Sequence, residues 1–184
     1  MRILPTAFKV YSVLTLISLI WIKLQNRLSL NLFLSTHWEQ VPKTLFMTLG
    51  AAAFLIGLFL FSAHHFLWAH QLETELSKVL VPLHFWEIGM LSLLSGFAEE
   101  LFFRGACQPV IGLFPTSVLF GMAHFVPRSP FWPWSLQAVF AGFLLGSIYE
   151  LTHLLYPVML AHLVTNFVLI LVMNRRYSTQ IQTL

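Results

Sequence analysis

Residues 94–104 read LSGFAEELFFR, an apolar stretch that contains two adjacent carboxylates, Glu99 and Glu100. The sequence on both sides of this stretch has the composition of a membrane-spanning segment. A charged side chain at the centre of a bilayer costs at least about 2.5–3.5 kcal/mol, and a second one adds to that cost. Because ionisable residues at such positions usually mark a functional site, the stretch predicts both a membrane protein and the place of its chemistry.

The overall composition also indicates an integral membrane protein. The chain of 184 residues is 58% hydrophobic and only 9% charged, whereas a soluble domain carries about 25% charged residues. The length fits one domain, residues 1–184. The net charge of +3 is small, and no basic patch lies among polar side chains that could read bases, so we expect no nucleic-acid partner.

Apolar segments along the chain predict an all-α, polytopic fold. A helix needs about 20 apolar residues to cross a bilayer. We expect about six transmembrane helices, over residues 6–21, 44–68, 84–103, 116–125, 135–151 and 157–173. Residues 71–78 are predicted to form a polar loop, and residues 105–115 a broken stretch. An even number of spans places both termini on the same side of the membrane.

The basic residues outside these segments predict the orientation. The side with both termini collects more of them than the other side does, which favours cytoplasmic termini. The first group is Arg2, Lys9, Lys78, Arg128, Arg175 and Arg176, and the second is Lys23, Arg27 and Lys43, with Arg104 if it lies in a loop.

Three sets of residues inside the predicted helices are candidates for a site. Residues four apart share a helix face, so Glu100 can pair with Arg104 and leave Glu99 on an adjacent face. In the same way Phe120 shares a face with His124, and His162 shares one with Asn166. The three sets are Glu99, Glu100 and Arg104 on the third span, Phe120 and His124 on the fourth, and His162 and Asn166 on the sixth.

These sets are expected to lie at one depth in the membrane. The turn between the third and fourth spans falls near Gly112, with Glu99 13 residues before it and His124 12 residues after it. Both side chains are then about 18–20 Å from the turn at 1.5 Å per helical residue. The turn near residues 153–156 is on the same side, and Asn166 lies a similar distance beyond it. We therefore expect a site between the third, fourth and sixth helices.

The residue types at this site suit hydrolysis of an acyl bond. A carboxylate and an imidazole, Glu99 and His124, can hold and deprotonate a water molecule. A second imidazole and an amide, His162 and Asn166, can donate to a developing oxyanion. The set Glu99, His124 and His162 could instead hold a divalent metal such as zinc, because carboxylate and imidazole are zinc ligands. The spacing of the residues does not choose between these two mechanisms.

Two other classes of protein remain open at this point. Buried glutamate and histidine also mark ion pathways, so a proton- or metal-coupled carrier is one alternative. Carriers usually show internal repeats, and the sequence shows none. The other alternative is a non-catalytic protein that binds the transmembrane helix of a partner.

The motifs EExxxR (99–104), FxxxH (120–124) and HxxxN (162–166) together resemble those of the CPBP family. This family comprises CAAX prenyl endopeptidases and bacteriocin-processing or immunity proteins. The resemblance covers residues 91–167, which would be the catalytic core, and implies an all-helical intramembrane endopeptidase. It implies that Glu99 and His124 activate water and that His162 and Asn166 stabilise the oxyanion. Glu100 and Arg104 would be supporting residues, as would Phe120.

The resemblance also bears on the substrate, the cofactor and the location. Members of the family have been described both as metalloproteases and as glutamate-type proteases. The expected substrate is a membrane-anchored protein or peptide in the bilayer. The short chain favours a C-terminal sorting signal, which pairs a short motif with one transmembrane helix and a basic tail, over a CAAX-like or leader peptide. Such substrates imply a bacterial plasma membrane.

Overall fold

The computed structural model describes residues 3–33, 38–127 and 131–181, and within them it contains helices and turns but no strand. The predicted all-α fold is confirmed. The helices are α1 (Ile3–Leu24), α2 (Val41–His65), α3 (Leu67–Leu80), α4 (Phe85–Glu100), α5 (Gln108–Ile111), α6 (Leu113–Ala123), α7 (Trp132–Thr152) and α8 (Leu155–Ile181). A π-helix, η3 (Leu101–Cys107), joins α4 to α5, and two short 3-10 helices, η1 (Leu30–Leu32) and η2 (Trp38–Gln40), lie between α1 and α2.

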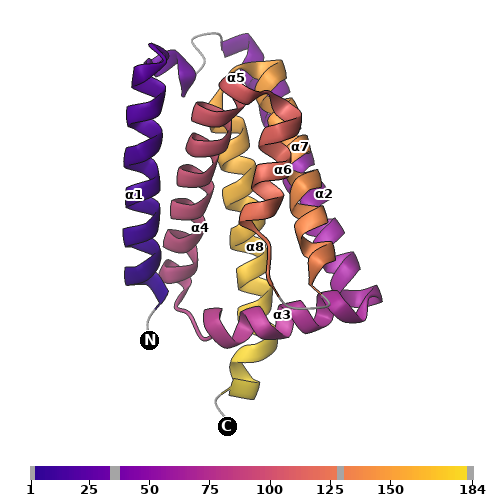
Figure 1. Cartoon of the computed structure of the whole chain (residues 1–184). Helices are drawn as coiled ribbons and strands as arrows, with labels where there is room; N and C mark the ends of the chain where they lie inside the picture. Colours follow the sequence, from indigo (N-terminus) through magenta and orange to yellow (C-terminus); the bar gives the residue numbers. More distant parts are fainter. Residues whose placement is uncertain (1–2, 34–37, 128–130, 182–184) are drawn as a thin grey trace.

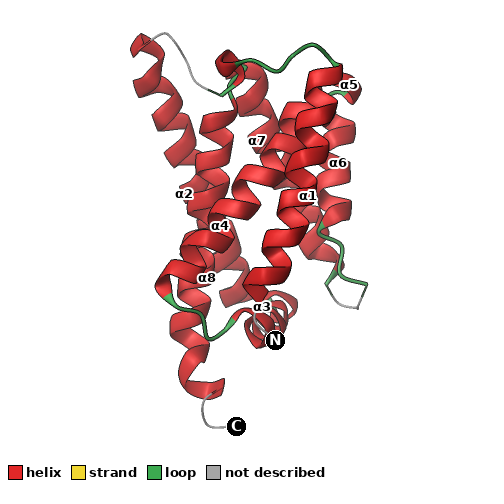
Figure 2. Ribbon diagram, turned by 90° about the vertical axis from the view of Figure 1, so that its left-hand side faces the viewer, coloured by secondary structure: helices red, strands yellow, loops and turns green. Residues whose placement is uncertain are grey.

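The long helices form an upright bundle, and α3 lies across one end of it (Figure 1). Helix α8 stands in the middle of the bundle, with α1 and α4 on one side and α2 and α7 on the other (Figure 1). The described chain begins and ends at the α3 end in both views (Figures 1 and 2). Two termini on one side agree with an even number of crossings. Arg2 and Arg128, which entered the orientation argument, lie outside the described residues.

The number of spans differs from the expected six. Among the described residues, four helices are long and apolar enough to cross a membrane: α1, α2, α7 and α8. A fifth span results if the bent pair formed by α3 and residues 85–111 is counted as one. Helix α6 has 11 residues and is therefore about 16 Å long, roughly half of the hydrocarbon thickness. Its place in the sequence was predicted, but it cannot cross the bilayer alone.

A further expectation was wrong. Residues 71–78 are not a loop but the middle of α3, which buries Ala69, Leu72 and Ser77 against the bundle. The charged residues of this segment hid its amphipathic pattern, and one of them, Glu73, is buried and accepts hydrogen bonds from Arg176 of α8 at 2.8 and 3.2 Å. The predicted broken stretch, residues 105–115, contains one reversal, at Gly112, and before it the helical run continues through η3 and α5.

The reversal between α5 and α6 falls at the predicted residue, Gly112. Its φ of 84° lies in the left-handed region, which glycine adopts without steric cost. Arg104 lies one turn beyond Glu100 inside the bundle and is 1% exposed, so it is not a loop residue. The loop charges on that side of the membrane are correspondingly fewer.

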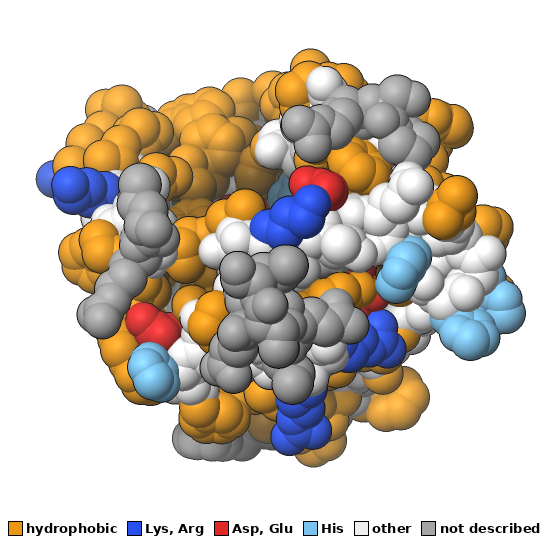
Figure 3. Space-filling view, turned by 90° about the horizontal axis from the view of Figure 1, so that it is seen from below, with side chains coloured by type: hydrophobic (Ala, Val, Ile, Leu, Met, Phe, Trp, Pro, Cys, Tyr) orange, Lys and Arg blue, Asp and Glu red, His pale blue; other side chains and the backbone are white. Residues whose placement is uncertain are grey.

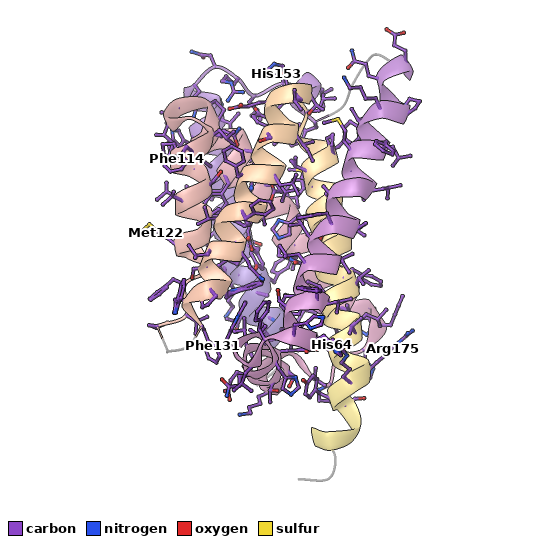
Figure 4. The ribbon with its side chains drawn as sticks, turned by 90° about the vertical axis from the view of Figure 1, so that its right-hand side faces the viewer. His64, Phe114, Met122, Phe131, His153 and Arg175 are labelled. Carbon is purple, nitrogen blue, oxygen red and sulfur yellow. The ribbon has the colours of Figure 1, made fainter. Side chains whose placement is uncertain are left out.

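The outside of the bundle is apolar along its length and polar at its ends. Phe114 and Met122 project from α6 away from the other helices (Figure 4), and both are largely exposed. His153 lies at one end of the bundle, whereas His64 and Arg175 lie toward the other (Figure 4). Seen from the α3 end, Lys, Arg and His side chains gather among hydrophobic ones (Figure 3). This distribution is typical of a protein whose sides face lipid.

Helix α4 lies close against α8 at Gly96, one turn before the acid pair. A Cβ atom on Gly96 would lie 2.9 Å from the backbone nitrogen of Leu163 and 3.2 Å from the backbone oxygen of Met159. Small residues allow such contacts in membrane bundles. The close approach at Gly96 sets the distance between the acids on α4 and the polar residues on α8.

We therefore predict that Gly96→Ala destabilises the protein by about 1–3 kcal/mol, because the added methyl group must push two backbones apart. Gly89→Ala, on the same helix, is the matched control, since a Cβ atom there meets nothing within 4 Å. Thermal unfolding in detergent measures both. Equal melting temperatures for the two variants would contradict this account of the α4–α8 contact.

Candidate active site

The seven residues singled out in the sequence come together in the bundle. Helix α4 ends with Glu99 and Glu100, and η3 carries Arg104 one turn further on. Phe120 lies in the last turn of α6, and His124 directly follows that helix. His162 and Asn166 come from the middle of α8. The expected meeting of the third, fourth and sixth segments at one depth is therefore present in the structure.

Glu100 and Arg104 form a buried ion pair. Their side chains are 0% and 1% exposed, and Arg104 Nη1 donates to Glu100 Oε1 at 2.9 Å. Arg104 Nη2 donates to the backbone oxygen of Gly142 on α7 at 3.0 Å. His162 Nδ1 donates to the same Glu100 oxygen at 2.7 Å. Because a buried charge is tolerated only when it is paired and hydrogen-bonded, this cluster joins η3, α7 and α8 around Glu100.

Phe120 packs against several members of the cluster. Its ring lies 4.6 Å from the Arg104 guanidinium carbon, an arrangement that allows a cation–π interaction. Ring centroids of Phe120 and His124 are 4.5 Å apart, and those of Phe120 and His162 are 5.9 Å apart. Phe120 thus separates the two histidines and holds both rings in place, which fits its predicted supporting role.

Glu99 differs from Glu100 in its surroundings. Its side chain is 14% exposed, and Oε1 accepts a hydrogen bond from the Tyr11 hydroxyl of α1 at 3.0 Å. Oε2 has no hydrogen-bond partner among the described residues and lies 3.7 Å from His124 Nε2. That distance is too long for a direct hydrogen bond, so the two atoms lie close together without being bonded to each other.

The orientation of His124 follows from its other ring nitrogen. His124 Nδ1 lies 2.8 Å from the backbone oxygen of Phe120. A carbonyl oxygen can only accept, so Nδ1 carries the proton of the neutral ring and Nε2 is left as the acceptor facing Glu99. The end of α6 at Ala123 makes this contact possible, because the helix no longer uses that carbonyl.

Asn166 is linked to α4, the helix that carries the two acids, by a hydrogen bond to a serine. Its Nδ2 donates to Ser95 Oγ at 2.9 Å, and Ser95 in turn donates to the backbone oxygen of Ser92 at 3.2 Å. Ser95, Glu99, His124 and Asn166 all line one cavity of about 420 Å³. This cavity extends to residues of α1 and α3, and its lining is mostly apolar. A peptide in the membrane could reach Glu99 along it.

The three residues named as metal ligands do not gather as a metal site. Among the described residues, no group of three or more His, Cys, Asp and Glu side chains is arranged to hold a metal ion. The reason is visible in the partners: His162 Nδ1 is bound to Glu100, while Glu99 Oε1 is bound to Tyr11. The set Glu99, His124 and His162 therefore does not fit the zinc alternative as these side chains lie.

Sequence reasoning missed two residues that contact the site. Tyr11 and Ser95 are hydrogen-bonded to Glu99 and Asn166, respectively. Tyr11 lies outside residues 91–167, on a segment without any motif. The available signal was its polar hydroxyl inside an apolar span, because a buried tyrosine hydroxyl usually has a partner. The sequence did not indicate which partner.

We predict that Tyr11→Phe changes the environment of Glu99 without changing the fold, since only the hydroxyl that donates to Oε1 is lost. The measurement is the infrared carboxylate band that disappears in Glu99→Gln, which should shift in Tyr11→Phe. Tyr177→Phe is the matched control, because its hydroxyl lies 3.4 Å from Thr74 of α3. An unshifted band in Tyr11→Phe would show that the hydrogen bond is absent in the membrane.

The part of the chain that contains the site is also the part that is similar to known proteins. Residues 81–168 match the family described as Type II CAAX prenyl endopeptidase Rce1-like. The uncharacterised protein YpbD of Bacillus subtilis (strain 168) is 41% identical over 92 residues, which cover 50% of this chain and 46% of that relative. No solved structure matches the chain. The matched segment contains α4 to α7 and the first half of α8, and with them all seven predicted site residues. The segment of this integral membrane protein that builds the site is therefore similar to the Rce1-like CAAX endopeptidase family.

Proposed function

We propose that this protein is an intramembrane endopeptidase that hydrolyses a peptide bond of a membrane-anchored substrate. The observation that carries the proposal is the pair formed by Glu99 Oε2 and His124 Nε2, which face each other across 3.7 Å at a mostly apolar cavity. Both atoms are free to act on a water molecule, because the other oxygen and the other nitrogen are held by Tyr11 and Phe120. Similarity of the matched segment to an endopeptidase family supports the proposal.

The first step in this mechanism is attack by water. Glu99 and His124 hold the water between Oε2 and Nε2, and Glu99 takes one of its protons as general base. The water oxygen bonds to the carbonyl carbon of the peptide, and the carbonyl oxygen becomes an oxyanion. We assign the stabilisation of this oxyanion to Asn166 and to His162, which lie one turn apart on α8. His162 acts here as the imidazolium, in which Nδ1 donates to Glu100 and Nε2 keeps a proton to donate to the oxyanion.

The second step releases the products. The proton held by Glu99 passes to the peptide nitrogen, the C–N bond breaks, and an amine and a carboxylic acid leave. Glu100 and Arg104 do not contact the reacting atoms. They fix the end of α4 through the bonds to Gly142 and His162, and so hold the adjacent Glu99 in position. In this mechanism Glu100 holds the helix in position and Glu99 acts on the water, which explains why Glu100 is fully buried and Glu99 borders a cavity.

The lining of the cavity and the family match support a substrate that is anchored in the membrane. A mostly apolar route that begins at α1 and α3 suits a peptide that is already in the membrane. We propose a C-terminal sorting signal as substrate, with CAAX-like and leader peptides as the alternatives to compare. The corresponding location is a bacterial plasma membrane with cytoplasmic termini, in which the α3 end of the bundle faces the cytoplasm.

We predict that Glu99→Gln and His124→Ala each abolish cleavage while the protein still inserts and folds. The loss should be at least about 100-fold, the usual contribution of general acid–base catalysis. The assay uses the protein in liposomes with single-span peptides that carry a short motif, an apolar helix and a basic tail, and mass spectrometry detects the products. Glu75→Gln is the matched control, because Glu75 lies on α3 in an exposed pair with Lys78.

Full cleavage by Glu99→Gln would overturn the assignment of Glu99 as base. A phenotype in cells that persists in Glu99→Gln without any cleavage would instead favour a helix-binding protein. Proton or metal uptake into the liposomes that depends on Glu99 would favour a carrier.

We also predict that the rate of cleavage is unchanged by EDTA and does not rise when zinc is then added. The physical reason is the arrangement of the side chains, in which His162 and Glu99 are already bound to Glu100 and Tyr11. The same peptides and liposomes serve for this test. Activity that is lost with chelator and restored by a divalent metal would show that these side chains rearrange into a metal site.

A further inference from the structure

We propose that a small cavity between α2, α7 and α8 is a specificity pocket that receives one aliphatic side chain of the substrate, next to the bond that is cut. This inference rests on the proposed peptidase function and names what the same site selects. The cavity has a volume of about 90 Å³. One side of it comes from α2, which lies outside the family match.

The position of this specificity pocket relative to the site is the first argument. His124, Asn166 and Trp134 line both the pocket and the 420 Å³ cavity that leads to Glu99. The pocket therefore begins where the larger cavity passes the proposed base and the proposed oxyanion donors. A peptide whose scissile bond lies beside Glu99 and His124 would bring a neighbouring side chain to the mouth of the pocket.

The chemistry of the walls is the second argument. Beyond the site residues, the lining is apolar, with leucines and Phe59 of α2 facing alanines of α7. The two polar side chains in the wall are already engaged: Gln137 Nε2 donates to Ser62 Oγ at 2.6 Å, and Thr165 Oγ1 donates to the Ala161 carbonyl at 2.8 Å. Against the leucines, Phe59 and alanines a charged side chain would lose its hydration without gaining a partner, whereas an aliphatic side chain would lose nothing.

The volume decides which apolar side chains fit. A cavity of about 150 Å³ is known to accommodate a benzene ring, and the specificity pocket, at about 90 Å³, is well below that. It has room for the few carbon atoms of valine, leucine or isoleucine and not for an aromatic ring. The space exists because Ala138 and Ala141 stand on the α7 side, where larger residues would fill it.

The test is a change of preference rather than a loss of activity. The probe is a set of single-span peptides whose residues at the membrane boundary are varied among Ala, Val, Leu, Phe and Asp, incubated with the protein in liposomes. Mass spectrometry locates the cut bond and the residues beside it. For the unchanged protein we expect Val or Leu at one flanking position to be preferred over Phe and Asp by about 10-fold or more, the range that one pocket can supply.

Ala141→Leu should then reverse the preference by filling the pocket. We expect the ratio of Leu to Ala peptides cut to fall by about 10-fold or more, with Ala peptides still cut at the same bond. Ala53→Leu is the matched control, since Ala53 is an exposed residue of α2 outside the pocket. It should leave the preference unchanged.

The outcomes separate the two proposals. Cleavage by the unchanged protein with no flanking preference, or with the same preference in Ala141→Leu, would overturn the specificity pocket and leave the peptidase function standing; the cavity would then be filled by a lipid chain or by packing alone. No cleavage of any peptide, under conditions in which the protein is folded, would overturn the peptidase function and the pocket with it.

Discussion

The buried ion pair between Glu100 and Arg104 is the constraint on which the rest of the site depends. Neither charge could remain inside an apolar bundle alone, because removing one partner of such a pair leaves an uncompensated charge that costs about 3–5 kcal/mol. Two further hydrogen bonds support the pair: Arg104 Nη2 donates to the backbone oxygen of Gly142 on α7, and Glu100 Oε1 also accepts from His162 of α8. Glu100 Oε2 and Arg104 Nε have no hydrogen-bond partner among the described residues. The pair thus fixes three segments relative to one another.

Helices α6 and α7 pack closely beside this pair. Gly142 allows its helix to approach α6, since a Cβ atom there would lie 3.1 Å from the Ser117 Cα and 3.3 Å from the Phe120 Cβ. The approach brings the ring of Phe120 under the Arg104 guanidinium. The π-helix η3 begins directly after Glu100, and such wider turns often occur at functional sites. Its freed carbonyls are covered by Gln25, which donates to Ala106 at 3.0 Å, and Arg27, which donates to Gly105 at 3.1 Å.

Segments outside the family match complete the site. Helix α1 supplies Tyr11 to Glu99, and the loop after it covers η3. Helix α2 supplies one side of the proposed pocket, with Leu55, Leu58 and Phe59, and α7 and α8 supply the others. The matched segment carries the proposed catalytic residues, whereas the flanking helices contribute contacts to Glu99 and part of the pocket lining.

Composition and the three motifs were enough to predict an all-α membrane protein, its resemblance to the matched family, the Glu100–Arg104 pair and the proximity of Glu99, His124 and Asn166. These features depend on helical spacing and hydropathy, which are local properties of the chain. The number of spans, the helix at residues 67–80, the contact between Tyr11 and Glu99, and the pairing of His162 with Glu100 were not predictable in this way. They depend on which helix faces lie against each other, and contacts such as the one at Gly96 decide this only when the whole bundle packs.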